Sequence, residues 1–137
     1  MKATIKLPVL GLLAAVLLSA CGGAGPKKVS YTLLTTLKDG EMAMVGVGGD
    51  IDGVKSPTLH ATVGETVEIT LTSGDVVEHD ISFPDFNALS ERVMGQGSTA
   101  TLIFVADKSG TFIYTCTIPG HADAGLKGTF VVSEPAP

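Results

Sequence analysis

The sequence lacks the pattern of an amphipathic helix longer than one or two turns, and it contains no internal repeat. Without helical periodicity, the organising pattern is a series of short β-prone runs separated by Gly, Pro, Asp and Ser. Residues 66–71 alternate strictly between polar and apolar side chains, as a strand with one wet face does. Short strands at such spacing predict an all-β sandwich.

Seven to eight strands are expected, and the candidates are residues 29–37, 41–47, 58–63, 66–72, 80–83, 99–105, 111–116 and 128–132. The segment 84–98 is long for a hairpin connection, and it is expected to contain a short helical turn. The length of the chain is enough for one domain with its own core.

Basic residues are scarce as well: nine Lys and Arg stand against fourteen Asp and Glu, which gives a formal net charge of −5. Two of the nine, Lys2 and Lys6, lie in the first twenty residues, where there is no acidic residue. The remainder carries seven basic (9 − 2) and fourteen acidic side chains, so its formal charge is −7. This balance argues against nucleic acid as a partner and favours a basic protein surface.

The first twenty residues have the features of an export signal. Lys2 and Lys6 precede an apolar run over residues 7–18, which is too short to span a bilayer comfortably and ends in small residues. The sequence Leu18-Ser19-Ala20-Cys21 resembles the lipobox of bacterial lipoproteins, in which the cysteine is diacylated and becomes the first mature residue. The alternative is an ordinary signal peptide with an incidental cysteine.

The chain is thus expected to comprise a signal peptide at residues 1–20, a flexible tether at residues 21–28 and a folded domain at residues 29–134. The tether includes Gly22-Gly23-Ala24-Gly25-Pro26, a composition typical of flexible linkers. With Cys21 acylated, a lipid would hold the domain on a membrane outside the cytoplasm, in the periplasm.

Cysteine is rare, because Cys21 and Cys116 are the only two in the chain. If Cys21 is acylated, Cys116 is the one remaining thiol and an internal disulfide is excluded. A lone thiol outside the cytoplasm is exposed to oxidation unless it is buried or bound to a metal. Cys116 is therefore either a buried inert side chain or a metal ligand, and its surroundings favour the ligand.

Cys116 ends a β-prone run, and His121 follows it five residues later, across Pro119-Gly120. An extended strand would hold the two side chains far apart, whereas a chain bent at Pro119-Gly120 can fold His121 back over Cys116. His79, in Glu78-His79-Asp80, is the obvious second imidazole. One thiolate and two imidazoles suit copper in a trigonal electron-transfer site. His60 alternates with apolar neighbours and is expected on the wet face of a strand.

Three stretches resemble the cupredoxins, a family of blue copper proteins: residues 78–84, 110–121 and 125–132. The resemblance covers roughly residues 58–132, and it is most specific in the ligand loop. That loop reads Y-x-C-x-x-P-G-H-x-x-x-G-M-x-G in similar cupredoxins, including domains related to copper nitrite reductases. The resemblance implies a Greek-key sandwich with a type 1 copper site, in which His79, Cys116 and His121 are the strong ligands.

The sequence departs from the family at the weak axial ligand, where a methionine is replaced by Leu126. Leucine has no donor atom, so copper would be three-coordinate, and the loss of a thioether would favour Cu(I) and a high reduction potential. One alternative is that Met94, Met42 or Met44 supplies the axial ligand. The other is that the site has lost copper altogether.

Asp80 is a second departure, because many cupredoxins have asparagine or another small polar residue after the first histidine. An aspartate can still accept N–H bonds from the cysteine loop, but its charge near copper would lower the potential. Leu126 and Asp80 therefore act in opposite directions. The apolar residues expected around the edge of His121, as a docking patch, are Ile118, Pro119, Ala122, Ala124 and Pro84.

The resemblance implies a one-electron carrier that cycles between Cu(I) and Cu(II) and is not itself an enzyme. Expected partners are redox proteins such as a c-type cytochrome, a terminal oxidase or a reductase, and the protein is expected to be a monomer. A nitrite reductase needs a catalytic copper with three further histidines, and a laccase needs more, whereas only His60 is left over. A hydrolase built on Cys116 would lack an oxyanion-hole motif. The alternatives are a copper trafficking or resistance protein and a copper-free docking module.

Overall fold

The structure is a computed structural model, and it describes residue 25, residues 27–38 and residues 40–137. The predicted signal peptide and Cys21 lie outside the described residues, as does most of the predicted tether. Within the described ranges, no helix has the length and apolar character needed to cross a membrane.

Nine strands and two short 3₁₀ helices, η1 and η2, make up the described part of the chain. In chain order they are β1 (Lys28–Lys38), β2 (Glu41–Val47), η1 (Gly49–Ile51), β3 (Leu59–Thr62), β4 (Thr66–Ser73), β5 (Ser82–Phe83), η2 (Pro84–Phe86), β6 (Ala88–Leu89), β7 (Thr99–Val105), β8 (Gly110–Thr115) and β9 (Lys127–Ser133).

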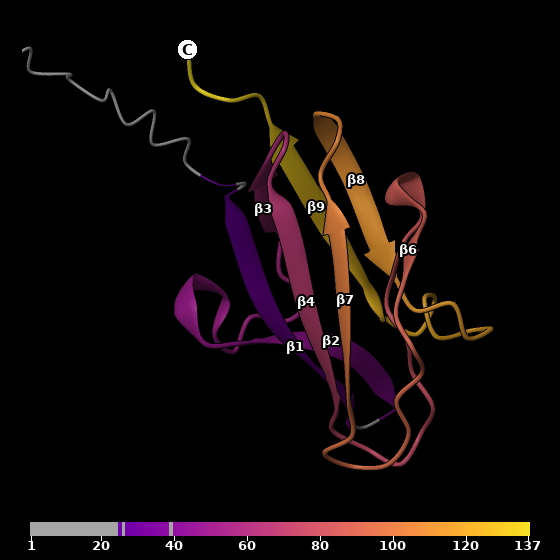
Figure 1. The fold of residues 1–137 in the computed structure, drawn as a ribbon. Helices are drawn as coiled ribbons and strands as arrows, with labels where there is room; N and C mark the ends of the chain where they lie inside the picture. The colour runs from indigo at the N-terminus through magenta and orange to yellow at the C-terminus, as the bar shows by residue number, and fades with distance from the viewer. Residues whose placement is uncertain (1–24, 26, 39) are drawn as a thin grey trace, which may run out of the picture.

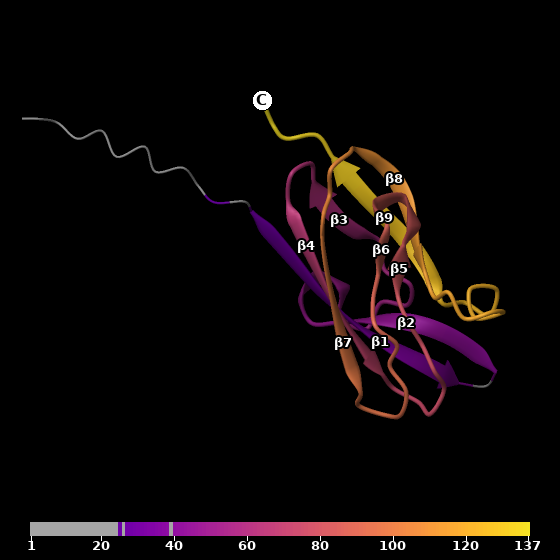
Figure 2. The ribbon, with the colours of Figure 1, turned by 45° about the vertical axis from the view of Figure 1, so that its right-hand side comes forward.

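The strands form two sheets that enclose one core (Figure 1 and Figure 2). One sheet has four strands in the order β2-β1-β4-β7, and the other has five in the order β3-β9-β8-β5-β6. β1 pairs in parallel with β4, and β3 pairs in parallel with β9, while the remaining pairs are antiparallel. Sequential strands repeatedly change sheet, so the chain crosses several times between the two sheets of a β-sandwich. The predicted all-β class is confirmed.

Each of the eight predicted strands is present, with bounds that differ by at most two residues. The added strand is β6, which lies in the segment 84–98 together with η2, the helical turn expected there. The strand predicted from residue 80 begins at Ser82, because Asp80 turns its side chain to the ligand loop rather than continuing a ladder.

The core combines alternating side chains of both sheets with an aromatic cluster. Val67, Ile69 and Leu71 are fully buried on one face of β4, as the alternation in the sequence predicts. Phe104 of β7 packs against Phe83 and Phe130 of the other sheet and against Phe86 of η2, with centroids 4.8–5.9 Å apart. Such ring pairs contribute about 0.5–1.5 kcal/mol beyond their buried area. They fix how the two sheets sit on each other.

Tyr114, two residues before Cys116, locks the end of β8 in place. Its ring is fully buried and its hydroxyl donates to the carbonyl oxygen of Pro57 at 2.7 Å. Gly128 stands opposite Tyr114 in the β8–β9 register, and a Cβ atom there would lie 2.2 Å from the tyrosine ring. Only glycine at position 128 leaves room for this ring. The contact between Tyr114 and Gly128 therefore fixes the two ends of the ligand loop relative to each other.

The loops that carry the predicted ligands and the start of β1 lie toward opposite ends of the sandwich. β4 ends at Ser73, β8 ends at Thr115 and β9 begins at Lys127, and the loops that follow or precede them meet at one end. β1 begins at Lys28, which is in register with Thr66 at the start of β4 and therefore lies toward the other end. Figure 1 shows the start of β1 and the C-terminus together, away from the loop between β8 and β9.

Candidate metal centre

The structure brings His79, Cys116 and His121 together at one end of the sandwich. One ligand atom from each lies within 4.8 Å of the others, and Cys116 Sγ is 3.6 Å from His121 Nδ1. The imidazole rings of His79 and His121 have centroids 5.2 Å apart. Two atoms that bind one metal at about 2.0–2.3 Å lie about 3–4 Å apart. The three side chains are therefore close to the spacing of ligands that share a single ion.

A tight turn folds His121 back toward Cys116. The N–H of His121 donates to the carbonyl oxygen of Ile118 at 3.1 Å, and Gly120 has a positive φ of 83°. Proline at the second position of a four-residue turn and a glycine with positive φ at the third are features of a type II turn. The Pro119-Gly120 pair thus produces the bend that the sequence predicts.

Leu126 is bonded to both ligands of the loop through its backbone. Its N–H donates to the carbonyl oxygen of His121 at 3.0 Å, and its own carbonyl oxygen accepts from the N–H of Cys116 at 2.9 Å. The side chain is fully buried. The family's axial position is therefore occupied by a buried apolar group that has no donor atom.

The ligand loop also rests on β2. The N–H of Met42 donates to the carbonyl oxygen of Ala124 at 3.0 Å, and Gly125, with φ of 117°, places its Cα so close that a Cβ would lie 2.2 Å from the Met42 oxygen. Met94 is 68% exposed and is not positioned as a ligand. Met42 and Met44, both on β2, stay the alternatives for a fourth ligand.

His79 is fixed from three sides. Its backbone N–H and carbonyl oxygen both bond to Val93, at 2.9 and 2.8 Å, and its Nε2 lies 2.9 Å from Asp75 Oδ1. The other ring nitrogen, Nδ1, is buried and has no hydrogen-bond partner among the described residues. Buried polar atoms normally have a partner, so an unpartnered nitrogen beside a thiol and a second imidazole fits a metal ion.

Asp80 connects the two ligand-bearing segments, as predicted. It is 1% exposed, and its Oδ1 accepts the backbone N–H of Thr117 at 2.6 Å while Oδ2 accepts the Thr117 hydroxyl. Arg92 Nε approaches Asp80 Oδ2 at 3.9 Å. These two hydrogen bonds hold the residue after His79 to the residue after Cys116 and so fix the spacing of His79 and Cys116.

Burial shifts the pKa of both ligands in the loop, in opposite directions. Desolvation raises the pKa of the Cys116 thiol, and the nearby Asp80 charge adds to this, while backbone hydrogen bonds from Asp80 and Ile118 oppose it. Desolvation lowers the pKa of His121, and the adjacent His79 lowers it further. The neutral imidazole is the form that binds a metal, whereas the thiol must lose its proton.

Asp75 is the site residue that sequence reasoning missed. In the sequence it belongs to Ser73-Gly74-Asp75, a turn-forming triplet that follows the predicted strand at residues 66–72. Its position four residues before His79 was the available signal, but an aspartate in a glycine-containing turn is common without any such role.

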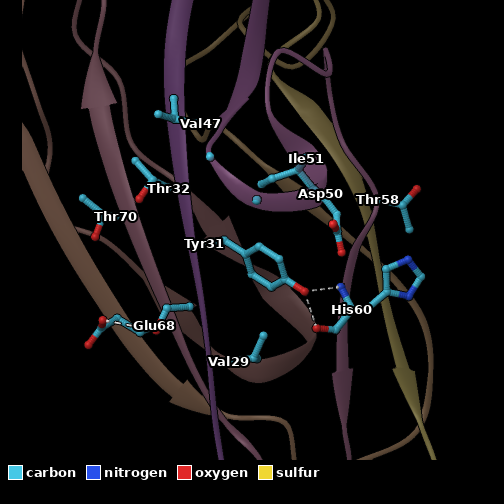
Figure 3. A pocket seen from close by; sticks show the side chains of 13 residues that line it. Val29, Tyr31, Thr32, Val47, Asp50, Ile51, Thr58, His60, Glu68 and Thr70 are labelled. Atoms are coloured by element: carbon cyan, nitrogen blue, oxygen red, sulfur yellow. Dashed lines mark hydrogen bonds between the residues drawn. The ribbon is translucent and has the colours of Figure 1, made fainter.

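His60 lies apart from the cluster, on β3, with an exposed side chain as predicted. It borders a groove of about 650 Å³ that is lined mainly by β1 and η1 (Figure 3). There the Tyr31 hydroxyl donates to the His60 carbonyl oxygen at 2.7 Å and accepts its N–H at 3.1 Å. The imidazole itself points away from Tyr31, so His60 takes part through its backbone.

One residue of the expected docking patch is misplaced. Pro84 begins η2, and Phe86 of that helix packs on Phe112 with ring centroids 4.9 Å apart. Phe112 lies near the start of β8, whereas Cys116 follows its end. Pro84 is therefore displaced along the strand from the ligand loop, because β5 runs antiparallel to β8 and carries the chain away from it.

A two-sheet sandwich with a cysteine and two histidines gathered at one end defines a copper protein with a cupredoxin fold, and comparisons with known proteins agree. Residues 91–136 match the family model of the multicopper oxidases. A copper-containing nitrite reductase of Rhizobium sullae is 30% identical over 124 residues, which cover 79% of this chain and 32% of that protein. The chain thus spans about a third of the length of that relative.

Two smaller proteins are also similar. The copper-resistant cuproprotein CopI of Rubrivivax gelatinosus is 26% identical over 55% of this chain and 56% of its own length. The structure of auracyanin A, a blue copper protein from Chloroflexus aurantiacus, superimposes with a TM-score of 0.56 at 18% identity, covering 77% of this chain and 99% of that one. The chain therefore has a cupredoxin fold and is similar in sequence to copper proteins, and the cofactor of its site is copper.

Proposed function

We propose that the protein is a one-electron carrier with a single type 1 copper held by His79, Cys116 and His121. The observation that carries this proposal is the cluster itself, in which one donor atom from each of the three side chains lies within 4.8 Å of the others. In addition, Nδ1 of His79 is buried and has no hydrogen-bond partner among the described residues. A thiolate with two imidazoles is the donor set of copper electron-transfer sites. Copper bound there supplies the Cu(II)/Cu(I) couple.

The surroundings of the ligands support electron transfer rather than substrate chemistry. His79 and Cys116 are 0% and 3% exposed, and each is held by backbone hydrogen bonds that do not depend on a metal. The residues thus keep one geometry and exclude water. His121 is only partly buried, so its ring edge offers the route by which an electron would leave toward a partner.

We further propose that the chain by itself is not an enzyme. The described residues contain one group of three clustered metal-ligating side chains, and the remaining histidine, His60, lies elsewhere with an exposed side chain. A nitrite reductase requires a second, catalytic copper with its own three histidines. The similarity to nitrite reductase covers 32% of that enzyme, which corresponds to one cupredoxin-like part of it.

The proposed location is the outer side of a membrane, with signal peptide 1–20 removed and Cys21 acylated. The position of Lys28 at the end of the sandwich away from the ligands supports this arrangement, because a tether there would leave the copper end free to meet a partner. A charge of −7 after removal of the signal favours redox proteins with a basic face as partners. The domain is proposed to cover residues 29–134 and to act as a monomer.

A second candidate function is copper handling, since the resistance protein CopI is among the similar proteins. A carrier of electrons keeps its metal in both oxidation states, whereas a carrier of copper passes the metal on. Dialysis of the Cu(I) form against a Cu(I) chelator separates the two: retention of copper over many electron-transfer cycles supports the electron carrier, and rapid loss supports copper handling.

The direct test is the visible absorption spectrum of the purified protein, titrated with Cu(II) and then with ascorbate. We expect an intense thiolate-to-copper band that saturates at one equivalent and bleaches on reduction. Cys116→Ser should lack the band, while His60→Ala, which changes a histidine outside the cluster, should keep it. A wild-type protein that binds copper weakly and without this band would overturn the proposal.

A further inference from the structure

The largely buried carboxylate of Asp75 contacts His79, the first histidine of the cluster. Asp75 Oδ1 lies 2.9 Å from His79 Nε2 and also accepts the N–H of Val77 at 2.8 Å. The Asp75 side chain is 12% exposed and the His79 side chain is fully buried. The second carboxylate oxygen, Oδ2, is buried without a hydrogen-bond partner among the described residues. Asp75 therefore faces His79 and not the solvent.

The turn that carries Asp75 is fixed by its neighbours. Ser73 Oγ donates to the Asp75 carbonyl oxygen at 3.0 Å, and the N–H of Gly74 donates to Thr35 Oγ1 at 3.3 Å. Gly74 is so close to β1 that a Cβ would lie 2.2 Å from the Thr35 carbonyl oxygen. Because the turn is pressed onto β1, the carboxylate has a defined position instead of being a mobile surface group.

We propose, building on the copper site above, that Asp75 is a positioning residue which holds His79 in the tautomer that binds copper and lowers the reduction potential of the site. A neutral imidazole has one N–H, and a carboxylate can accept a hydrogen bond but cannot donate one. Asp75 therefore places the proton on Nε2 and leaves Nδ1, which has no hydrogen-bond partner among the described residues, with a lone pair that could bind the metal.

The charge of Asp75 acts on the electron-transfer step. In that step one electron comes from a reduced redox protein, Cu(II) becomes Cu(I), and no bond to the protein forms or breaks. The positive charge of the centre falls by one, so a nearby negative charge favours the oxidised form.

Asp80 is also buried, but Arg92 lies 3.9 Å from it and Thr117 donates to both of its oxygens. Among the described residues, no lysine or arginine forms a salt bridge with Asp75, so the negative charge of Asp75 is less compensated than that of Asp80.

The test compares Asp75→Asn with Glu78→Gln in the full protein. Asparagine keeps an oxygen that can accept from Nε2 and Val77 but removes the charge. Glu78 is one residue from His79, is 41% exposed and pairs with Arg92, so it is a control for a screened charge in the same loop. We expect Asp75→Asn to shift the Cu(II)/Cu(I) equilibrium toward Cu(I) by about tenfold or more, equal to ~59 mV for one electron, and Glu78→Gln to shift it much less.

A second measurement addresses the tautomer. In the diamagnetic Cu(I) protein labelled with ¹⁵N-histidine, we expect a slowly exchanging Nε2–H signal for His79, which Asp75→Leu should abolish because leucine offers no acceptor. Asp75→Asn still offers Nε2 an acceptor oxygen, so the positioning role requires that it stays folded by circular dichroism and keeps the thiolate-to-copper band. Equal potentials in Asp75→Asn and Glu78→Gln, or an unchanged Nε2–H signal in Asp75→Leu, would overturn it.

The two proposals fail in different ways. A wild-type protein without the thiolate-to-copper band removes the electron-carrier function itself. A wild-type protein with the band, but with a potential that is insensitive to Asp75, removes only the role of Asp75.

Discussion

Replacing Gly128 with alanine tests whether close packing at the base of the ligand loop positions the copper site. A Cβ at residue 128 would lie 2.2 Å from both Cζ and Oη of Tyr114, which is fully buried and bonded to the Pro57 carbonyl oxygen. Overpacking costs about 1–3 kcal/mol, and a buried carbonyl left without its donor costs about 1–3 kcal/mol more. We expect the free energy of unfolding to fall by roughly 2–6 kcal/mol, a large part of the ~5–15 kcal/mol of a small domain.

The assay is urea unfolding of the copper-free protein, followed by far-UV circular dichroism, so that metal binding adds nothing to the measured stability. A double-mutant cycle with Tyr114→Leu supplies the control, because in that background the added methyl group meets no aromatic ring. The substitution at Gly128 should then cost much less than it does beside Tyr114. The reasoning is wrong if the cost is the same in both backgrounds, or if Gly128→Ala alone changes stability by less than about 0.5 kcal/mol.

Three further results are expected. Leu126→Met should add a thioether donor, favour Cu(II) and lower the reduction potential, which cyclic voltammetry would detect; an unchanged potential would mean that residue 126 does not face the metal. Burial raises the pKa of Tyr114 above its ordinary value of 10.0, so its contribution to stability is complete below about pH 10 and is lost as the pH rises further. Tyr114→Phe should remove that alkaline loss in thermal unfolding. Burial raises the pKa of Cys116, so copper uptake should release one proton from the thiol, measured by calorimetry in two buffers, and the release should be absent in Cys116→Ser.

The main strands could be predicted from the sequence because their periodicity is local. β2 and β7 have the predicted bounds, and the alternation of β4 puts Val67, Ile69 and Leu71 in the core. β6 could not be predicted in the same way. It has two residues, pairs only with β5, and exists because the chain after η2 returns along the edge of the sheet. Nothing in two residues marks such a tertiary pairing.

The metal cluster could be predicted from the sequence only in so far as its residue types are unusual. Cys116 and His121 are joined by a turn whose proline and glycine are visible in the sequence, so their proximity follows from local geometry. The partnership of Asp75 with His79 depends instead on how the turn after β4 is pressed onto β1, a contact between segments 39 residues apart. Pro84 was misplaced for a related reason, since the direction of β5 along β8 is set by sheet pairing.

The segment that carries His79 and the segment that carries Cys116 come from different sheets, and this arrangement makes the site rigid. His79 lies in the chain that crosses from β4, in the four-stranded sheet, to β5, whereas Cys116 directly follows β8 of the five-stranded sheet. The bond from Thr117 to Asp80 joins the two segments before any metal is present. The distance between the imidazole and the thiol is therefore set by the packing of the sheets and not by the preference of the ion. A centre held in this way changes little when one electron is added, which is the property that an electron carrier needs and that a copper donor does not.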